Sequence, residues 1–353
     1  MRRYKLFLFC LCFFVFFASF PLFGKILTER LRLFKTIPSN MEYSFFKFMP
    51  PSFDTDSGGH LYFPLNFKHI ILKVNHNGKI IKKIGRKGKG PGDLYLPFLL
   101  KIHKNKMFVV DNNSFSLFTI EGVFIRRFRY FSGINDFTIS DNKIYASYII
   151  GKEVVKVFDF YGKKLFSFAD LVKINNIDYG IYRNKQIDFE DLTSSKITSS
   201  CRNIFLLFPQ FGTICKYDTK GSFLNKKIIY FDDPEFDKKL KRIRNLLIGG
   251  KYQCSKINLQ KKSKCVDIWL MGSIQYYNKK LYISVSSNFT GVNKAVIFQF
   301  NKDTFVPEKK YVLYAKDCNV SDYFLVKKER GKTQFLIPVD NYKTGYISIG
   351  VFK

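Results

Sequence analysis

The stretch Phe118-Thr-Ile-Glu-Gly122-Val-Phe124-Ile125 contains the pattern that decides the fold: an aromatic residue or valine, three residues, a glycine, one residue and then apolar residues. This pattern is typical of a β-hairpin, because strands flank a short polar turn and glycine supplies the positive φ that the turn needs. Three further copies carry the glycine and a weaker fifth copy lacks it: 74–81, 158–165, 217–224 and 300–305. The four glycines are therefore expected to occupy equivalent bends, namely Gly78, Gly122, Gly162 and Gly221.

A second hairpin signal precedes the glycine pattern in several copies. A polar Asn-Lys turn followed by an apolar strand begins at Asn105, Asn142 and Asn278. Each unit thus holds two hairpins, and four strands with their turns need about 40 residues, which is the period of a propeller blade. The chain is predicted to be an all-β, six-bladed β-propeller of four-stranded antiparallel blades, with approximate units 43–84, 94–129, 134–168, 200–231, 272–314 and 320–353.

The composition agrees with an all-β chain and argues against disorder. Phe occurs 41 times and Tyr 21 times, and aromatic side chains fit the half-buried surface of a sheet. We divide the chain into an N-terminal targeting segment (1–24), a linker (25–42) and the propeller (43–353). A propeller ring must close, and we expect a strand near residues 43–48 to pair with the last blade.

Two intervals interrupt the repeat. Residues 170–199 are polar and are expected to form a long loop. Residues 232–268 form an insertion with a helix at about 234–248, which Asp233 caps and Pro234 begins. One face of this helix is apolar (Phe236, Leu240, Ile243 and Leu247) and the rest is basic. Such a helix either packs its apolar stripe on the host domain or binds a membrane or partner.

The N-terminus carries a targeting signal. Arg2, Arg3 and Lys5 precede an apolar run from Leu6 to Phe23. This pattern indicates either a cleaved signal peptide or an uncleaved membrane anchor, because about 18 residues are just long enough to cross a bilayer. In both cases the propeller is predicted to be extracytoplasmic: periplasmic, secreted or membrane-anchored.

Five cysteines follow that segment, and export would permit disulfides. The short-range pairings are Cys201 with Cys215 and Cys254 with Cys265, which leaves Cys318 over. The alternative is that all five thiols are free and buried. No pair has C-x-x-C spacing, so the cysteines do not indicate a zinc or redox site.

The stretch Ile84-Gly-Arg-Lys-Gly-Lys-Gly-Pro-Gly-Asp-Leu94, followed by Pro97 and Phe108-Val-Val-Asp111, resembles the NHL-repeat type of six-bladed propeller. It is similar in particular to exported bacterial propellers with a G-x-G-x-G-P-G-[DE]-[FL] connection between blades. The match covers residues 74–130 and falls to spacing alone in later units. The resemblance implies a binding or scaffold module and assigns no ligand.

Several groups of polar residues have the chemistry of a binding site. The loop from Gly85 to Gly92 lacks the spacing of a phosphate-binding loop and is better explained as a blade connection, although Arg86, Lys87 and Lys89 could meet an anion there. Asp54 and Asp56 could hold Ca²⁺, but further ligands are missing. Asp111 and Asp136 could face the channel, and Asp at a strand end usually caps a turn. The four histidines show no paired metal-ligand spacing: His60, His69, His76 and His103.

The net charge is +31, with 59 Lys and Arg against 28 Asp and Glu. The lysines are spread along the chain, so we interpret this charge as a solubility term with weak attraction for anions. The prediction is a non-enzymatic binding or scaffold module with no catalytic, cofactor or metal residue assigned. Its partner is an unknown protein or a glycan or other polyanion, with no specific nucleic acid, and membrane attachment could occur through residues 6–23. The alternative is a metal-dependent lyase or lactonase-type propeller enzyme.

Overall fold

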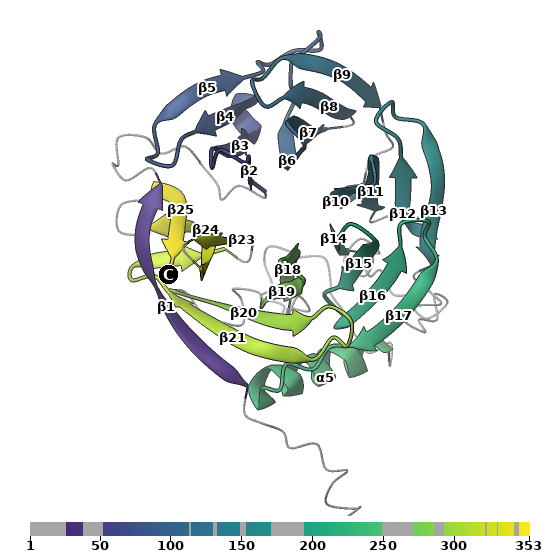
Figure 1. Ribbon diagram of the computed structural model, residues 1–353, viewed down its shortest axis with the longest axis vertical. Coiled ribbons are helices and arrows are strands. Elements are labelled where there is room, and N and C mark those ends of the chain that lie inside the picture. Colours follow the sequence, from purple (N-terminus) through teal and green to yellow (C-terminus); the bar gives the residue numbers. More distant parts are fainter. Residues whose placement is uncertain are drawn as a thin grey trace, which may run out of the picture.

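Antiparallel strands form nearly all of the described chain, and their sheets are arranged in a ring (Figure 1). The computed structural model describes residues 26–37, 52–112, 114–129, 133–148, 153–170, 194–248, 271–285, 293–321, 323–329, 331–341 and 346–353. The all-β prediction is confirmed, with four-stranded antiparallel sheets and, within these described ranges, one α-helix.

Four sheets contain four strands each in chain order. The first two comprise β2 (Asp54–Thr55), β3 (Leu61–Leu65), β4 (Ile70–Val74) and β5 (Ile80–Ile84), then β6 (Pro97–His103), β7 (Lys106–Asp111), β8 (Ser114–Thr119) and β9 (Phe124–Arg129). The next two comprise β10 (Ile134–Ser140), β11 (Lys143–Tyr148), β12 (Glu153–Phe158) and β13 (Lys164–Asp170), then β14 (Lys196–Ser199), β15 (Asn203–Phe208), β16 (Thr213–Asp218) and β17 (Phe223–Ile228). A short 3₁₀ helix, η1 (Asn66–Lys68), joins β3 to β4. The interval 170–199, expected to be a loop, thus contains β14; residues 171–193 lie outside the described residues.

The remaining strands form one nine-stranded sheet. It contains β18 (Met271–Tyr277), β19 (Lys280–Val285), β20 (Lys294–Asn301), β21 (Pro307–Tyr314), β1 (Leu27–Ile37), β25 (Tyr346–Phe352), β24 (Lys332–Asn341), β22 (Cys318–Val320) and β23 (Leu325–Glu329). The core lies largely between neighbouring sheets. For example, Phe108 and Phe115 of the second sheet belong to one buried cluster with Phe137 of the third.

The four predicted glycines occupy equivalent turns between the third and fourth strands of their sheets, as the sequence predicts. All four have positive φ, between 80° and 90°. Each glycine N–H donates to the carbonyl three residues earlier, for example from Gly162 to Asp159. The side chain at that earlier position also accepts from the turn backbone: Asp159 Oδ1 accepts from the N–H groups of Tyr161 and Lys163. The weaker fifth copy forms the β20–β21 turn, where Phe305 takes the positive φ.

Each of three turn glycines lies against the outer strand of the preceding sheet. A Cβ added to Gly122 would meet Ile84 of β5 at 2.7 Å. At Gly162 it would meet Phe128 of β9 at 2.4 Å, and at Gly221 it would meet Phe168 of β13 at 2.9 Å. Since real Cβ atoms do not approach so closely, the turn glycine sets the spacing between successive sheets.

Aromatic residues on the second strands complete these contacts between sheets. The Tyr62 hydroxyl lies 3.1 Å from the Ile120 carbonyl oxygen in the next turn, and the Tyr145 hydroxyl donates to the Thr219 carbonyl at 2.7 Å. Phe108 packs on Phe160, with ring centroids 4.9 Å apart. The Asn-Lys signals mark the turns before these strands, so they locate the first hairpin of their sheets.

Strand β1 lies within the segment expected to be a linker (25–42), and it joins two parts of the large sheet. Residues 27–32 pair in parallel with β21, and residues 33–37 pair antiparallel with β25. An N-terminal strand therefore pairs with the last strand, as ring closure requires, but it is not the predicted strand at 43–48, which lies outside the described residues. Leu31 and Ile37 are buried and alternate with the exposed Arg30, Arg32 and Phe34. In the sequence, Lys35 stands at a position where this alternation calls for an apolar residue, and the aromatic Phe34 stands at an outward one, which makes the strand hard to predict.

The predicted helix is confirmed as α5 (Pro234–Ile248). Asp233 Oδ1 accepts from the N–H groups of Glu235 and Phe236 at 3.2 and 3.4 Å, so it caps the first turn. The apolar face packs on the sheets, since Phe236, Leu240 and Ile243 are all buried in one core cluster. Residues 249–268 of the expected insertion lie outside the described residues.

The pairing of Cys201 with Cys215 is wrong, because both thiols are free, as is Cys318. Cys215 on β16 pairs in register with Leu206, whereas Cys201 lies before Asn203 at the other end of the hairpin. Five residues of strand separate the two positions by roughly 16 Å, too far for a disulfide. Cys254 and Cys265 lie outside the described residues.

We predict that Gly162→Ala destabilises the protein more than Gly331→Ala. Both glycines have positive φ, but a Cβ at Gly331 meets nothing within 4 Å, whereas one at Gly162 clashes with Phe128. The shared backbone strain is about 1–2 kcal/mol. Overpacking should lower the free energy of unfolding in urea by about a further 1–3 kcal/mol for Gly162→Ala. Equal losses for the two variants would contradict the proposed packing role.

Candidate functional site

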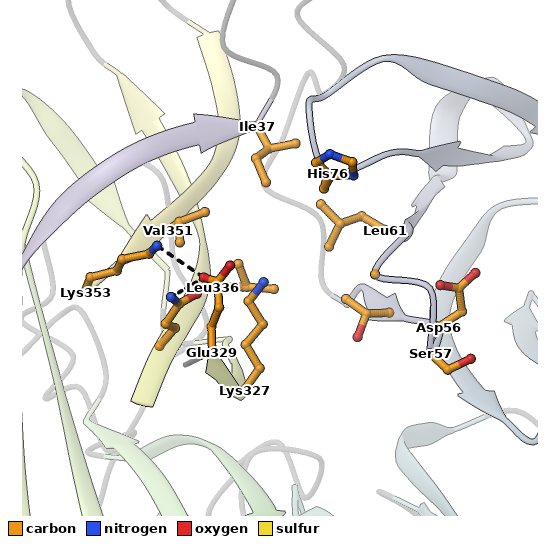
Figure 2. A pocket seen from close by; sticks show the side chains of 13 residues that line it. Ile37, Asp56, Ser57, Leu61, His76, Lys327, Glu329, Leu336, Val351 and Lys353 are labelled. Carbon is orange, nitrogen blue, oxygen red and sulfur yellow. Dashed lines mark hydrogen bonds and ion pairs between the residues drawn. The ribbon is translucent and has the colours of Figure 1, made fainter. Parts of the chain in front are cut away.

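A pocket lies at the seam where the first sheet, β2–β5, meets β1 and the C-terminal strands β23–β25 (Figure 2). Its volume is about 370 Å³, which is enough for a small ligand or a few residues of a partner. We call it the seam pocket. It is lined by Ile37, Thr55, Asp56, Ser57, Gly59, Leu61, His76, Lys327, Glu329, Gln334, Leu336, Val351 and Lys353.

The apolar part of the seam pocket comes from residues of the two neighbouring sheets. Leu61 of β3 lies on one side, and Leu336 of β24 and Val351 of β25 lie on the other (Figure 2). All three are buried, as is Ile37 at the end of β1. These side chains offer an aliphatic surface to a ligand.

Gln334 is the polar group of this pocket whose bonding is incomplete. It is only 2% exposed. Its Nε2 donates to Glu329 Oε2, and Glu329 also pairs with Lys353 Nζ at 3.2 Å. The Gln334 Oε1 atom is buried and has no hydrogen-bond partner among the described residues. A buried acceptor left without a donor is unfavourable, so a small rotation of the Gln334 amide that brought Oε1 to a ligand N–H or O–H would be stabilising.

The opposite wall is a closed hydrogen-bond network around Asp56. Its Oδ2 lies 2.9 Å from both His60 Nδ1 and the Tyr62 hydroxyl, and its Oδ1 accepts from the His60 N–H. Burial opposes ionisation of Asp56, but the hydrogen bonds from His60 and Tyr62 outweigh it and hold the pKa of this carboxyl below its usual range. Burial and the same carboxylate raise the pKa of Tyr62. Ser57 and His76 lie at the exposed rim.

Asp54 and Asp56, the two carboxylates considered as Ca²⁺ ligands, bind different partners. Asp54 Oδ1 accepts from the Thr55 N–H, and its Oδ2 accepts from the Ile102 N–H of β6, both at 2.8 Å. Asp56 is bound to His60 and Tyr62. These two carboxylates thus serve the contact between sheets and the loop itself, and the structure does not bring them together.

The strands that lie nearest the axis are linked to one another by hydrogen bonds (Figure 1). In each link, a side-chain oxygen on one strand accepts from a backbone N–H on the next of these strands around the ring. In addition to Asp54, the Oδ2 of Asp136 accepts from the Ile197 N–H at 3.1 Å, and Gln275 Oε1 accepts from the Val326 N–H at 3.2 Å. Asp136, weighed as a channel residue, is therefore a structural link. Lys101 Nζ donates to the Tyr323 hydroxyl at 3.3 Å. Burial alone would lower the pKa of Lys101, but the negative groups around it outweigh that effect and raise the pKa.

The Gly85–Gly92 loop contains its own anion. Asp93 Oδ1 pairs with Arg86 Nε at 2.8 Å, and Asp93 Oδ2 accepts from the Gly90 N–H at 2.9 Å. A Cβ at Gly88 would lie 2.1 Å from the same carboxylate. The loop connects β5 to β6, as predicted, and the Asp93 carboxylate occupies the place that an external anion would need.

Asp111 and two of the histidines considered as site residues each have a different environment. Asp111 Oδ2 accepts from the Tyr95 N–H at 3.1 Å, and Asp111 also accepts from the Ser114 hydroxyl. His69 Nδ1 accepts from the Leu96 N–H, and burial lowers the pKa of His103. Among the described residues, no group of three or more His, Cys, Asp or Glu side chains is placed to hold a metal ion.

A ring of antiparallel sheets defines a β-propeller, and three solved structures share this fold. A Bacteroides fragilis protein inferred to be exported is 13% identical, with a TM-score of 0.56 over 92% of this chain and 98% of that chain. A member of the DUF4221 family from Bacteroides vulgatus is 12% identical, with a TM-score of 0.54 over 93% and 97%. A catalytically inactive virginiamycin B lyase from Staphylococcus aureus, solved with quinupristin, is 12% identical, with a TM-score of 0.51 over 89% and 97%.

At these identities the likeness shows the fold alone. No protein-family model matches the sequence, and no curated protein matches it either. The seam pocket was not predicted, because its lining comes from segments at both ends of the chain. Gln334 carries no local signal that would distinguish it from any other strand glutamine.

We predict that Asp56 makes stability depend on pH. Because its folded pKa is depressed, its stabilisation is present above the ordinary value near 4 and is lost as the pH falls through the folded pKa. The free energy of unfolding should therefore fall less steeply between about pH 4 and pH 2 in Asp56→Asn than in the wild type. Asp141→Asn is the matched control and should change the slope less than Asp56→Asn, because the Asp141 carboxylate is 59% exposed and solvent screens its ion pair with Lys143. An unchanged slope in Asp56→Asn would contradict the assignment.

Proposed function

We propose that this chain is a non-enzymatic, extracytoplasmic binding or scaffold module, built as a six-bladed propeller with NHL-like repeats, whose ligand occupies the seam pocket. The observation that carries the binding role is that Gln334, which lines the pocket beside an aliphatic surface, has a buried Oε1 with no partner among the residues that the structure describes. Ligand sites commonly combine an apolar surface with a few polar groups in this way.

Six blades follow if the nine-stranded sheet is divided at β1. The four separate sheets are then four blades, β18–β21 form a fifth, and β22–β25 with the end of β1 form a sixth. The parallel pairing of β1 with β21 joins the fifth and sixth blades edge to edge. This division supports the predicted number of units.

An extracytoplasmic location is supported by the sequence and by one neighbour. The basic residues before the apolar run at 6–23 are typical of an export signal. The Bacteroides fragilis propeller is inferred to be exported. Among the described residues, no helix is long and apolar enough to cross a membrane, and the run at 6–23 lies outside them.

A binding role is favoured over the metal-dependent lyase or lactonase alternative because the aspartates near the axis and the seam pocket form hydrogen bonds and ion pairs within the fold. Asp54, Asp93 and Asp136 accept from backbone or guanidinium donors that hold the fold together. Asp56 is engaged by His60 and Tyr62. The alternative is suggested only by the shared fold of virginiamycin B lyase, and fold does not fix function.

Metal analysis distinguishes these two functions. We expect the protein purified after export to retain far less than one equivalent of Zn²⁺ or Ca²⁺ after extensive dialysis. Elemental mass spectrometry measures the retained metal, with a known zinc enzyme as the control. A stoichiometric metal that survives dialysis would contradict the binding role and favour the enzyme.

Ligand-observed NMR tests the seam pocket. We expect saturation transfer to N-acetyl-leucine amide, which pairs an N–H donor with an aliphatic side chain, and less to N-acetylglycine amide, which lacks that side chain. Ser57→Trp should block the rim and remove the signal, whereas Ser222→Trp, at an exposed turn elsewhere, should preserve it. A stronger, Ser57-dependent signal from N-acetylglucosamine would identify a glycan ligand. Equal signals in both variants for every probe would contradict the pocket as the binding site.

A further inference from the structure

Helix α5 presents a cationic face that the packing of the propeller leaves unused. Lys238, Lys241 and Arg242 are exposed, and spacings of three and four residues place them on one side of the helix. None of the three has an acidic partner among the residues that the structure describes. Lys239, by contrast, pairs with Glu235 at 2.6 Å. This face therefore carries three positive charges that are open to solvent.

A groove of about 520 Å³ runs between α5 and the segment after β17. Its cationic lining includes Lys238, Lys241 and Arg244, and the exposed Tyr230 lies on the opposite side. Burial lowers the pKa of Arg244, and its Nη1 is buried without a hydrogen-bond partner among the described residues. Among the described residues, Asp237 is the one carboxylate that lines the groove, and the cationic side chains outnumber it; its Oδ1 and Oδ2 accept from the Phe231 and Asp233 N–H groups. The groove therefore suits an anionic group.

The start of β1 lies beside this helix (Figure 1). Leu27 and Thr28 pair with Lys309 and Lys310 of β21. Lys310 in turn forms an ion pair with Asp233 at the start of α5, and its Nζ lies 5.4 Å from the centre of the Phe236 ring. Ile26 packs against the core cluster that contains Phe236. The point where the N-terminal segment enters the propeller is thus fixed next to α5.

The apolar run at 6–23 ends only three residues before Ile26. Three extended residues span at most about 10 Å. If the run remains in a bilayer, the start of β1 must lie within that distance of the lipid surface, and the first turn of α5 lies next to it. Leu27, which is 65% exposed, and Tyr230, which is 61% exposed, would then be at the depth where apolar and aromatic side chains meet headgroups.

We propose that residues 6–23 anchor the protein and that the face formed by α5, Tyr230 and the start of β1 rests on an anionic lipid surface, with a headgroup phosphate in the α5 groove. This goes beyond the binding role proposed above and concerns a different face from the seam pocket. Each cation close to an anionic leaflet strengthens association about fivefold, so the three exposed cations together contribute about 100-fold.

Hydroxyl-radical footprinting of the full chain, reconstituted through its own N-terminal run, tests the orientation. Oxidation of Tyr230 should fall at least about fivefold on vesicles with 30% phosphatidylglycerol relative to phosphatidylcholine alone, and about 0.5 M NaCl should restore it. Tyr161, 74% exposed in the β12–β13 turn, is the control and should react equally on both vesicles. Equal oxidation of Tyr230 on both vesicles would overturn the proposal.

Two variants that each remove three positive charges distinguish an effect of the α5 face from an effect of the net charge. Lys238→Gln/Lys241→Gln/Arg242→Gln should lose the protection of Tyr230, whereas Lys79→Gln/Lys83→Gln/Arg129→Gln, on exposed sites of β5, β9 and an adjoining turn, should keep it. Equal protection in both variants would overturn the proposal. So would protection by soluble heparin but not by vesicles, or a mature N-terminus beyond residue 23. None of these results bears on ligand binding at the seam pocket, so the two proposals can fail separately.

Discussion

The close approach of each turn glycine to the outer strand of the preceding sheet is the constraint on which the ring depends. Gly122, Gly162 and Gly221 combine a left-handed backbone with a contact that leaves no room for a Cβ. Both requirements select glycine, and together they fix the distance from one sheet to the next. In the β20–β21 turn, Phe305 takes the left-handed conformation and packs edge-on against Phe205 of the preceding sheet, so an aromatic contact replaces the glycine contact there.

The seam between the first and last sheets is where the strand order becomes irregular, and a pocket lies at this seam. Both β22 and β23 pair with β24, so the C-terminal part of the large sheet does not repeat the simple four-strand order of the others. The aliphatic side chains of Leu61 and Leu336 line this pocket together with Gln334, whose buried Oε1 has no hydrogen-bond partner in the described part of the chain. An irregular sheet in an otherwise regular ring thus creates the concave surface that a binding role requires.

The features that could be predicted from sequence depend on residues close together in the chain. The glycine turns, the Asn-Lys turns and α5 with its Asp233 cap are specified by local backbone preferences. The role of Asp93 could also be predicted from sequence, because this residue directly follows the glycine-rich loop whose backbone it binds. Strand β1 and the seam pocket could not be predicted, since β21, β25 and Gln334 lie nearly the whole chain away from their N-terminal neighbours.

The position of β1 between β21 and β25 has a consequence for how the protein is made. Its backbone groups emerge from the ribosome long before either of its partners is synthesised, so this strand waits unpaired while the rest of the chain follows. The ring therefore cannot be completed by a partly translated chain. For a chain that crosses a membrane before folding, such delayed closure means that the ring is completed on the far side.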